Sequence, residues 1–265
     1  MSPRPVQLIL AALTALGSGL LLAATALAQP AAPLAPPAAA APPAPPAPLP
    51  PIATEGQLYA PGDFERLEIA GAAYVRLLQG DRDQVFIAGG PEVQKSVELE
   101  LRRDRLVIRP AGGWKFWNTS RLQIDVLMRQ LSQLVISGSS EVRAPGPLRA
   151  ERLAVQISGA GQVRFDELQA EQLRFVVSGA GDGLLRGQVR DLQLQVSGKG
   201  KLIAEQLRAT RATVGISGIG NANLWVSDDL QIHVSGIGTI EYWGQPEVHR
   251  HTSGFATVKA LGDKR

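Results

Sequence analysis

The stretch ISGAGQV, from Ile157 to Val163, decides the fold of this chain because its Ser-Gly pair recurs along the sequence. The interval from one serine of such a pair to the next is 18 to 21 residues. A repeat of about 20 residues is typical of a solenoid, in which each repeat forms one coil. The pairs begin at Ser137, Ser158, Ser178, Ser197, Ser217, Ser235 and Ser253.

Apolar residues alternate with polar ones on both sides of each Ser-Gly pair. In the copy at Ser158, residues 153, 155 and 157 are Leu, Val and Ile, and residues 163 and 165 are Val and Phe. Period-two alternation indicates β-strands with one buried face. Each repeat therefore predicts a strand, a glycine corner and a second strand. Glycine suits the corner because a Cβ would clash there or because a positive φ is needed.

A single coil cannot bury its own apolar face, so we expect successive coils to stack in parallel, about 4.8 Å apart. The sequence thus predicts an all-β fold, a right-handed parallel β-helix with coils of about 20 residues over 131–265. Alternating segments at 97–101, 106–110 and 122–128 predict a β-rich N-terminal cap with the first coils over 56–130.

The first 55 residues have a different composition. Arg4 precedes an apolar run over 8–27, and Ala26-Leu27-Ala28 has the form of a signal-peptidase site. We interpret 1–28 as a signal peptide, with an uncleaved membrane anchor as the alternative. Residues 29–55 are rich in Ala and Pro and predict a semi-rigid linker before a single domain over 56–265. The expected location is the periplasm or the secreted fraction, at the cell envelope.

Charge and motif spacing limit the possible functions. The chain has 27 basic and 24 acidic residues with no block of like charge, which does not favour a nucleic-acid partner. The glycine turns precede strands, whereas nucleotide-binding loops precede helices. Asp166 and Glu205 are separated by a repeat that carries Arg186, which disfavours catalysis by paired carboxylates. We expect no enzyme and no cofactor. A carbohydrate-active enzyme, a polysaccharide lyase or hydrolase on a β-helix, is the alternative.

Two aromatic groups are candidate binding sites. Trp225 and Trp243 both lie eight residues after a repeat serine, on the outward face. They form either a platform for a sugar ring or partner protein, or a surface covered by a C-terminal segment. Trp114, Phe116 and Trp117 form the second group. They predict an exposed contact patch or membrane anchor, with packing against the first coils as the alternative.

The three histidines are candidate metal ligands. His233 and His251 each lie two residues before a repeat serine, and His249 lies four residues before one. Stacked coils would bring these outward imidazoles together, and three imidazoles can hold zinc or copper. The alternative is a group of exposed histidines near a polar terminal strand, without a metal.

Three segments carry a resemblance to a known family: FERLEIAGAAYVRLLQGDRDQVFIAG from Phe64, LVIRP from Leu106, and LSQLVISGSSEVRA from Leu131. With the Ser-Gly turns that follow, the chain resembles the head GIN domain family over about 64–258. The resemblance implies an exported bacterial β-helical domain without a catalytic motif. We therefore expect an adhesion-related binding or scaffolding protein whose partner is an envelope protein or glycan. Membrane contact is expected only through an uncleaved N-terminal segment.

Overall fold

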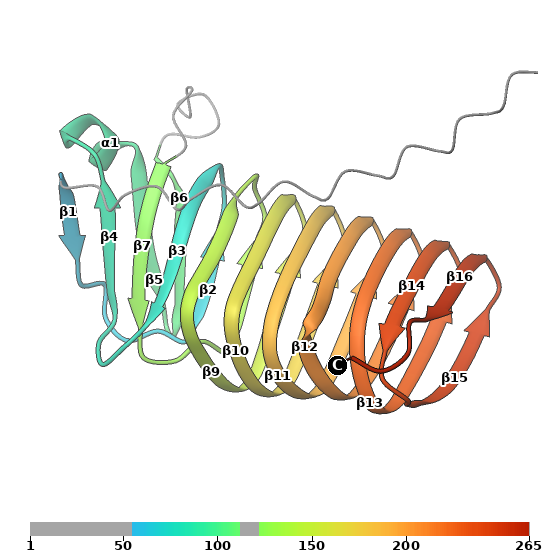
Figure 1. Ribbon diagram of the computed structural model, residues 1–265. Coiled ribbons are helices and arrows are strands. Elements are labelled where there is room, and N and C mark those ends of the chain that lie inside the picture. The colour runs from blue at the N-terminus through green and yellow to red at the C-terminus, as the bar shows by residue number, and fades with distance from the viewer. Residues whose placement is uncertain (1–54, 112–121, 265) are drawn as a thin grey trace, which may run out of the picture. The chain divides into compact units, whose positions relative to one another are not determined.

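The computed structural model describes residues 55–111 and 122–264 (Figure 1). The predicted signal peptide and nearly all of the linker lie outside these ranges. The described ranges form 16 strands and one short helix, α1 (Pro91–Lys95). No helix within them is long and apolar enough to cross a membrane. The all-β prediction is therefore confirmed, and α1, which opens with Pro91 and has Glu92 in its first turn, is an element that the sequence analysis did not predict.

Long strands that follow one another along the chain make up the central coils. Each strand pairs in parallel with the next, in the order β9-β10-β11-β12-β13-β14-β16, and β15 also pairs with β13. This is the predicted parallel β-helix. The strands are β9 (Glu141–Ile157), β10 (Ala160–Val177), β11 (Ala180–Val196), β12 (Lys199–Ile216), β13 (Ile219–Val234), β14 (Ile237–Trp243), β15 (Glu247–Thr252) and β16 (Phe255–Ala260).

Shorter strands build the first coils and close the N-terminal end (Figure 1). The parallel strands are β2 (Arg66–Ile69), β3 (Ala73–Gln79), β6 (Arg105–Pro110), β7 (Leu122–Met128) and β8 (Gln133–Ile136). Three further strands, β1 (Gly56–Tyr59), β4 (Gln84–Ala88) and β5 (Val97–Arg102), pair antiparallel to their neighbours. Antiparallel pairing stops the addition of further coils at this end, so these strands act as the cap.

The Ser-Gly corners lie directly above one another. The backbone N–H of Ser178 donates to the carbonyl of Ile157, and that of Ala180 donates to the carbonyl of Gly159, each with an N to O distance of 2.9 Å. A Cβ added to Gly179 would lie 2.1 Å from the Gly159 carbonyl oxygen. Gly179 does not have a positive φ. Of the two reasons for glycine here, the close approach of successive coils is the correct one.

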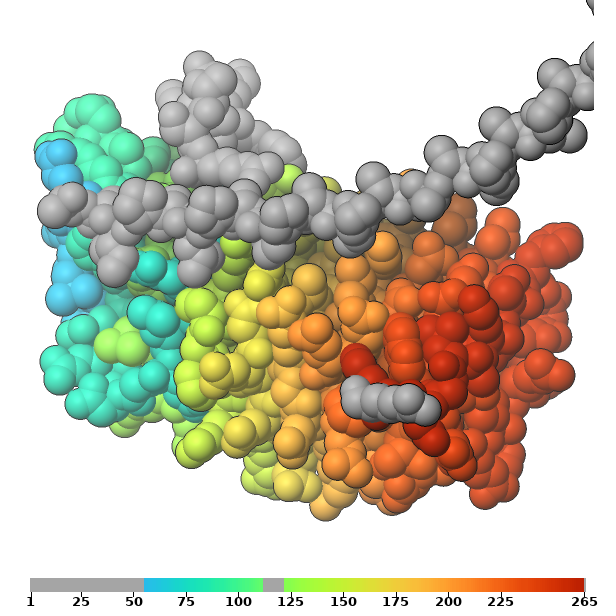
Figure 2. Space-filling view, viewed as in Figure 1, coloured from blue at the N-terminus to red at the C-terminus, as the bar shows by residue number. Residues whose placement is uncertain are grey.

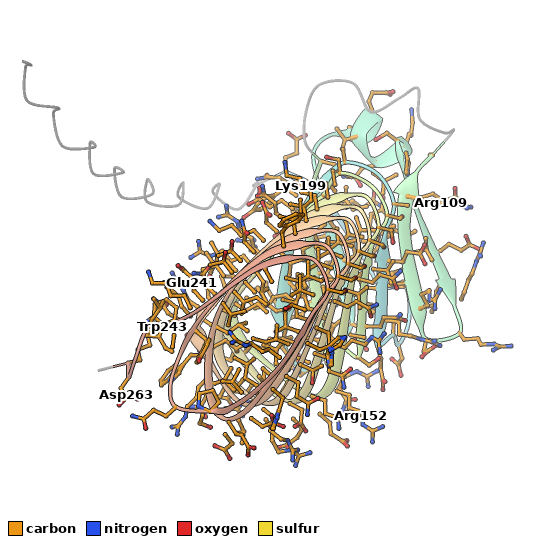
Figure 3. The ribbon with its side chains drawn as sticks, turned by 90° about the vertical axis from the view of Figure 1, so that its right-hand side faces the viewer. Arg109, Arg152, Lys199, Glu241, Trp243 and Asp263 are labelled. Carbon is orange, nitrogen blue, oxygen red and sulfur yellow. The ribbon has the colours of Figure 1, made fainter. Side chains whose placement is uncertain are left out.

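Each coil bends a second time, in the middle of its long strand. In β10 the pairing register with β11 shifts between Phe165 and Leu168. Consecutive fully buried side chains there are Phe165, Leu168 and Leu173, so the period-two alternation is interrupted. Seen along the solenoid axis, the coil is flattened, with Lys199 at one narrow end and Arg152 at the other (Figure 3). The sequence analysis predicted the glycine corner and missed this second bend.

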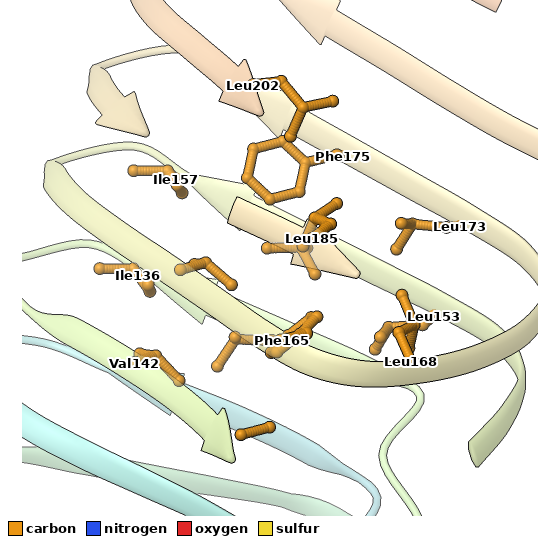
Figure 4. Close-up of a cluster of buried hydrophobic side chains, with 14 of the residues drawn as sticks. Ile136, Val142, Leu153, Ile157, Phe165, Leu168, Leu173, Phe175, Leu185 and Leu202 are labelled. Atoms are coloured by element: carbon orange, nitrogen blue, oxygen red, sulfur yellow. The ribbon is translucent and has the colours of Figure 1, made fainter. Parts of the chain in front are cut away.

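Apolar side chains fill the space between the two sides of each coil. Phe165 and Phe175 are 0% and 1% exposed and pack with Leu185 and Leu202 from the following coils (Figure 4). The described residues from position 50 onward belong to one compact unit with a continuous core. Because the interior is filled, candidate sites lie on the outer surface.

Candidate functional site

A groove with a volume of about 960 Å³ runs across the coils at the second bend. One wall consists of outward residues that are register partners on successive strands, from Arg149 through Gln169 and Gln188 to Arg208. We call these four residues the bend ladder. All four are exposed, and neighbouring strands are about 4.8 Å apart, so the ladder extends over about 14 Å.

Small apolar side chains form the floor of the groove beside the bend ladder. Ala150, Ala170 and Val189 are register partners of one another and each follows a ladder residue in the chain. Their short side chains leave the long Gln and Arg side chains standing above the floor. The arrangement suits a ligand that is extended along the solenoid axis and has both polar groups and apolar faces.

The groove has a surplus of positive charge, because five arginines and three glutamates line it. Glu151 pairs with Arg152 at 3.3 Å and Glu171 pairs with Arg190 at 2.9 Å. Among the described residues, neither Arg149 nor Arg208 has a carboxylate partner. These two guanidinium groups are therefore available to an external anion.

Arginines also keep the carboxyl group of an aspartate next to the groove ionised. Arg211 Nε lies 2.6 Å from Asp191 Oδ1, and Arg190 Nε lies 3.2 Å from Asp191 Oδ2. These hydrogen bonds, that of Arg211 above all, hold the pKa of the Asp191 carboxyl below its usual range. Asp191 thus stays ionised and neutralises part of the positive charge beside the groove.

Gln79 closes the N-terminal end of the groove. Its amide nitrogen donates to the carbonyl oxygens of Arg129 and Arg149 at 2.9 and 3.0 Å, and its amide oxygen accepts from the Arg149 backbone N–H at 2.7 Å. β3 ends at Gln79, between β7 and β9. The side-chain amide therefore takes the place of a peptide group where the strand stops, and it joins the two neighbouring strands.

Trp225 and Trp243 continue the line of the bend ladder toward the C-terminus. They are register partners, and Trp225 is also the register partner of Arg208. The Arg208 guanidinium lies 5.8 Å from the centroid of the Trp225 ring. The coil of β13 is shorter than that of β12, and the resulting register shift between Ala204 and Arg208 aligns these residues.

The C-terminal residues of the described chain lie on the outer surface of the last coils (Figure 2). Lys264 lies over both tryptophan rings. The Lys264 ammonium lies 5.4 and 5.2 Å from the ring centroids of Trp225 and Trp243, and it donates to the carbonyl oxygen of Glu205. The Gly244 backbone N–H donates to the Gly262 carbonyl at 2.9 Å. The structure thus has the alternative arrangement, in which a C-terminal segment lies over the pair, and both rings are half-buried.

The three histidines lie on the neighbouring strands β13 and β15. His233 and His251 are register partners, whereas His249 lies opposite Gln231. The His249 Nε2 atom lies 3.2 Å from a carboxylate oxygen of Glu247. Over residues 55–111 and 122–264 there is no group of three or more His, Cys, Asp or Glu side chains placed to hold a metal. The pairing of His233 with His251 and the place of His249, two residues before His251, are those expected from stacked coils, and binding of zinc or copper by these three residues stays a prediction.

Two other groups of residues from the sequence analysis remain. Trp114, Phe116 and Trp117 lie outside the described residues. Asp166 lies 2.9 Å from Arg164 Nε and 3.5 Å from Arg186 Nη1, so it belongs to a cluster with two arginines and not to a pair of carboxylates.

The sequence analysis missed the bend ladder. Its four residues recur every 19 or 20 residues, but they lie ten to twelve residues after their repeat serines, so a fixed count from the serine does not align them.

Comparisons with known proteins identify the fold and the family. No curated protein matches the chain. A "putative adhesin" from Bacteroides fragilis has a similar structure, with a TM-score of 0.72 and 20% identity over 78% of this chain and 96% of that one. A "putative lipid binding protein" from Parabacteroides distasonis (TM-score 0.63, 19% identity) covers the same shares. A "putative adhesin" from Parabacteroides merdae (TM-score 0.62, 18% identity) covers 78% of this chain and 95% of its own. A family model described as "Putative auto-transporter adhesin, head GIN domain" matches residues 63–246, and the chain therefore belongs to that family.

Proposed function

We propose that this protein is a non-catalytic, adhesion-related binding protein of the bacterial cell envelope, and that its groove holds an extended anionic glycan. The observation that carries the proposal is the bend ladder, with Arg149 and Arg208 at its ends and Gln169 and Gln188 between them. The family description and the predicted signal peptide support adhesion and export, respectively.

The chemistry of the bend ladder matches that of a charged polysaccharide. A glutamine amide both donates and accepts hydrogen bonds, as sugar hydroxyls do. A guanidinium group binds a carboxylate or sulfate through two parallel hydrogen bonds. Arg208 also stands over the Trp225 ring, and this cation–π contact limits the orientations of its guanidinium. The short side chains of Ala150, Ala170 and Val189 leave room for sugar rings on the floor.

An enzyme that acts on glycans is the second class of function considered from the sequence. Such an enzyme needs a carboxyl that can be protonated as a general acid. In the groove, Glu151 and Glu171 are each engaged by an arginine, and of the three glutamates only Glu65 has no ion pair among the described residues, so the groove does not offer a pair of unengaged carboxylates. We therefore favour binding over hydrolysis or elimination.

The test is retention of soluble anionic polysaccharides, with polyuronates as the first probe, by immobilised residues 56–265. This segment contains the whole described core. We expect Arg149→Gln together with Arg208→Gln to weaken binding by about tenfold or more for each lost charge-assisted contact. Arg174→Gln is the matched control because Arg174 is also exposed and has no carboxylate partner among the described residues, and it lies outside the groove. It should bind like the parent.

The same assay distinguishes the groove from the tryptophan pair. If Trp225→Ala with Trp243→Ala abolishes retention while the arginine variants do not, the tryptophans form the binding face and the groove proposal is wrong. If the parent retains no anionic polysaccharide from any source, including an envelope extract, the glycan proposal is wrong. Cleavage of a retained polymer into shorter products would show an enzyme.

A further inference from the structure

The outer edge of the Ser-Gly corner carries an apolar ridge near the C-terminal end of the solenoid. Ile219, Ile237 and Phe255 are register partners on successive coils. They are 53%, 54% and 82% exposed, and they account for three of the five large apolar side chains that are exposed in the described part of the chain. We call them the corner ridge. Neighbouring strands are about 4.8 Å apart, so the ridge extends over about 10 Å.

Positive charge adjoins the corner ridge on its N-terminal side. Lys199 is the register partner of Ile219 and so occupies the next position of the same column. Lys201 lies two residues further along that strand, and its register partner Asp182 accepts from the Lys201 backbone N–H at 3.1 Å. Neither ammonium has a carboxylate partner among the described residues. The columns on either side of the three apolar residues are uncharged, and they consist of Ser217, Ser235 and Ser253, and of Asn221, Thr239 and Thr257.

The position of the ridge on the coil favours a soft binding partner. Lys199 marks a narrow end of the flattened coil, where side chains project from a convex edge (Figure 3). A row of apolar side chains on a convex edge has little area for a flat protein surface. It can enter the boundary between headgroups and acyl chains of a bilayer. There the apolar side chains are buried and the lysines are attracted to anionic lipids.

We propose that the corner ridge inserts into the surface of an anionic lipid bilayer, with Lys199 and Lys201 at the lipid phosphates. This contact is additional to any contact through the N-terminal segment. The groove lies around the opposite narrow end of the coil, where Arg152 is located (Figure 3). A domain docked by the corner ridge would therefore leave its groove open. The proposal does not depend on glycan binding.

The test is sedimentation of residues 56–265 with vesicles of phosphatidylethanolamine and phosphatidylglycerol. We expect the parent to bind these vesicles and not vesicles of phosphatidylcholine alone. Ile237→Ser with Phe255→Ser should reduce the bound fraction by about tenfold or more, because two exposed apolar side chains no longer enter the bilayer. Lys199→Gln with Lys201→Gln should weaken binding and reduce its sensitivity to salt. Leu58→Ser is the matched control, since Leu58 is a 58% exposed aliphatic residue outside the ridge.

Several outcomes would overturn the proposal. Equal binding of the parent and the Ile237, Phe255 double variant would do so, as would equal binding to neutral and anionic vesicles. Light scattering after gel filtration tests whether the ridge instead mediates self-association of the chain. If the parent is a dimer and the double variant a monomer, the ridge is an interface between copies of the chain. Unchanged melting temperatures of all the variants would exclude misfolding as the cause of any loss.

Discussion

We expect Gly179→Ala to destabilise the solenoid strongly, although it adds only one methyl group. The new carbon would lie 2.1 Å from the Gly159 carbonyl oxygen and 2.4 Å from that of Ser158. Both contacts are with the backbone of the preceding coil, so no side-chain rotation relieves them. The corner must open by about 1 Å to reach an ordinary van der Waals distance.

The structure indicates the cost of opening this corner. Two interstrand hydrogen bonds span it, from Ser178 N–H to Ile157 and from Ala180 N–H to Gly159, each 2.9 Å long. Their loss costs about 1 kcal/mol each, and overpacking adds about 1–3 kcal/mol. The free energy of unfolding should therefore fall by about 3–5 kcal/mol. For a domain of this size the melting temperature should fall by roughly 6–20 °C.

Gly215→Ala is the matched control. Gly215 also lies in a strand of the solenoid and lacks a positive φ, but the nearest atom to an added Cβ is the Leu194 carbonyl oxygen at 3.8 Å. Its melting temperature should stay the same or rise slightly. The free energy of unfolding should increase by no more than about 1 kcal/mol. Thermal unfolding of residues 56–265 followed by far-UV circular dichroism makes the comparison. If Gly179→Ala melts with the parent, or if both variants change equally, the close approach of the coils is not the reason for the corner glycine.

Two further predictions concern stability. Ile157 is 0% exposed, and Ile157→Asp should cost several kcal/mol by burying an unpaired carboxylate, so its melting temperature should drop well below that of the parent. An unchanged melting temperature would contradict the assignment of inward positions. Gln79→Ala removes three side-chain hydrogen bonds, one to Arg129 after β7 and two to Arg149 in β9, and should lower the free energy of unfolding by about 2–3 kcal/mol, measured as a lower urea midpoint. Gln169→Ala, at an exposed position of the bend ladder, should leave the midpoint unchanged, and equal midpoints for both variants would argue against the bridging role of Gln79.

The coils could be predicted from the sequence because their signal is local. Residues 153, 155 and 157 alternate regularly up to the serine, and glycine marks the corner. The second bend has no marker that recurs in every coil. The chain passes it through Pro145-Gly146-Pro147 in β9 and through Gly187, which has a φ of 125°, in β11, whereas β10 and β12 have neither glycine nor proline there. In β10, Phe165, Leu168 and Leu173 all face inward at intervals of three and five residues, so a local pattern of alternation cannot distinguish this bend from the end of a strand.

The groove was harder to predict because its residues are aligned by the fold. Arg149 lies twelve residues after its repeat serine, Gln169 eleven and Gln188 ten. Small differences in coil length at the bend shift these positions, so that a fixed count from the serine does not align them. The same shift places Trp225, eight residues after its serine, opposite Arg208, which lies eleven residues after its own. The pairing register, which only the structure provides, was needed to connect them.

The vertical alignment of the corners makes one complete coil the unit by which this domain can change in length. A duplicated coil would bring its own Ser-Gly pair, its own inward apolar residues and one more outward position at the groove, and would move the two ends apart by about 4.8 Å. An insertion of only part of a coil would instead displace every following column from its neighbours. Gain and loss of sequence in this architecture should therefore be tolerated in whole coils, and the length of the groove should change in equal steps.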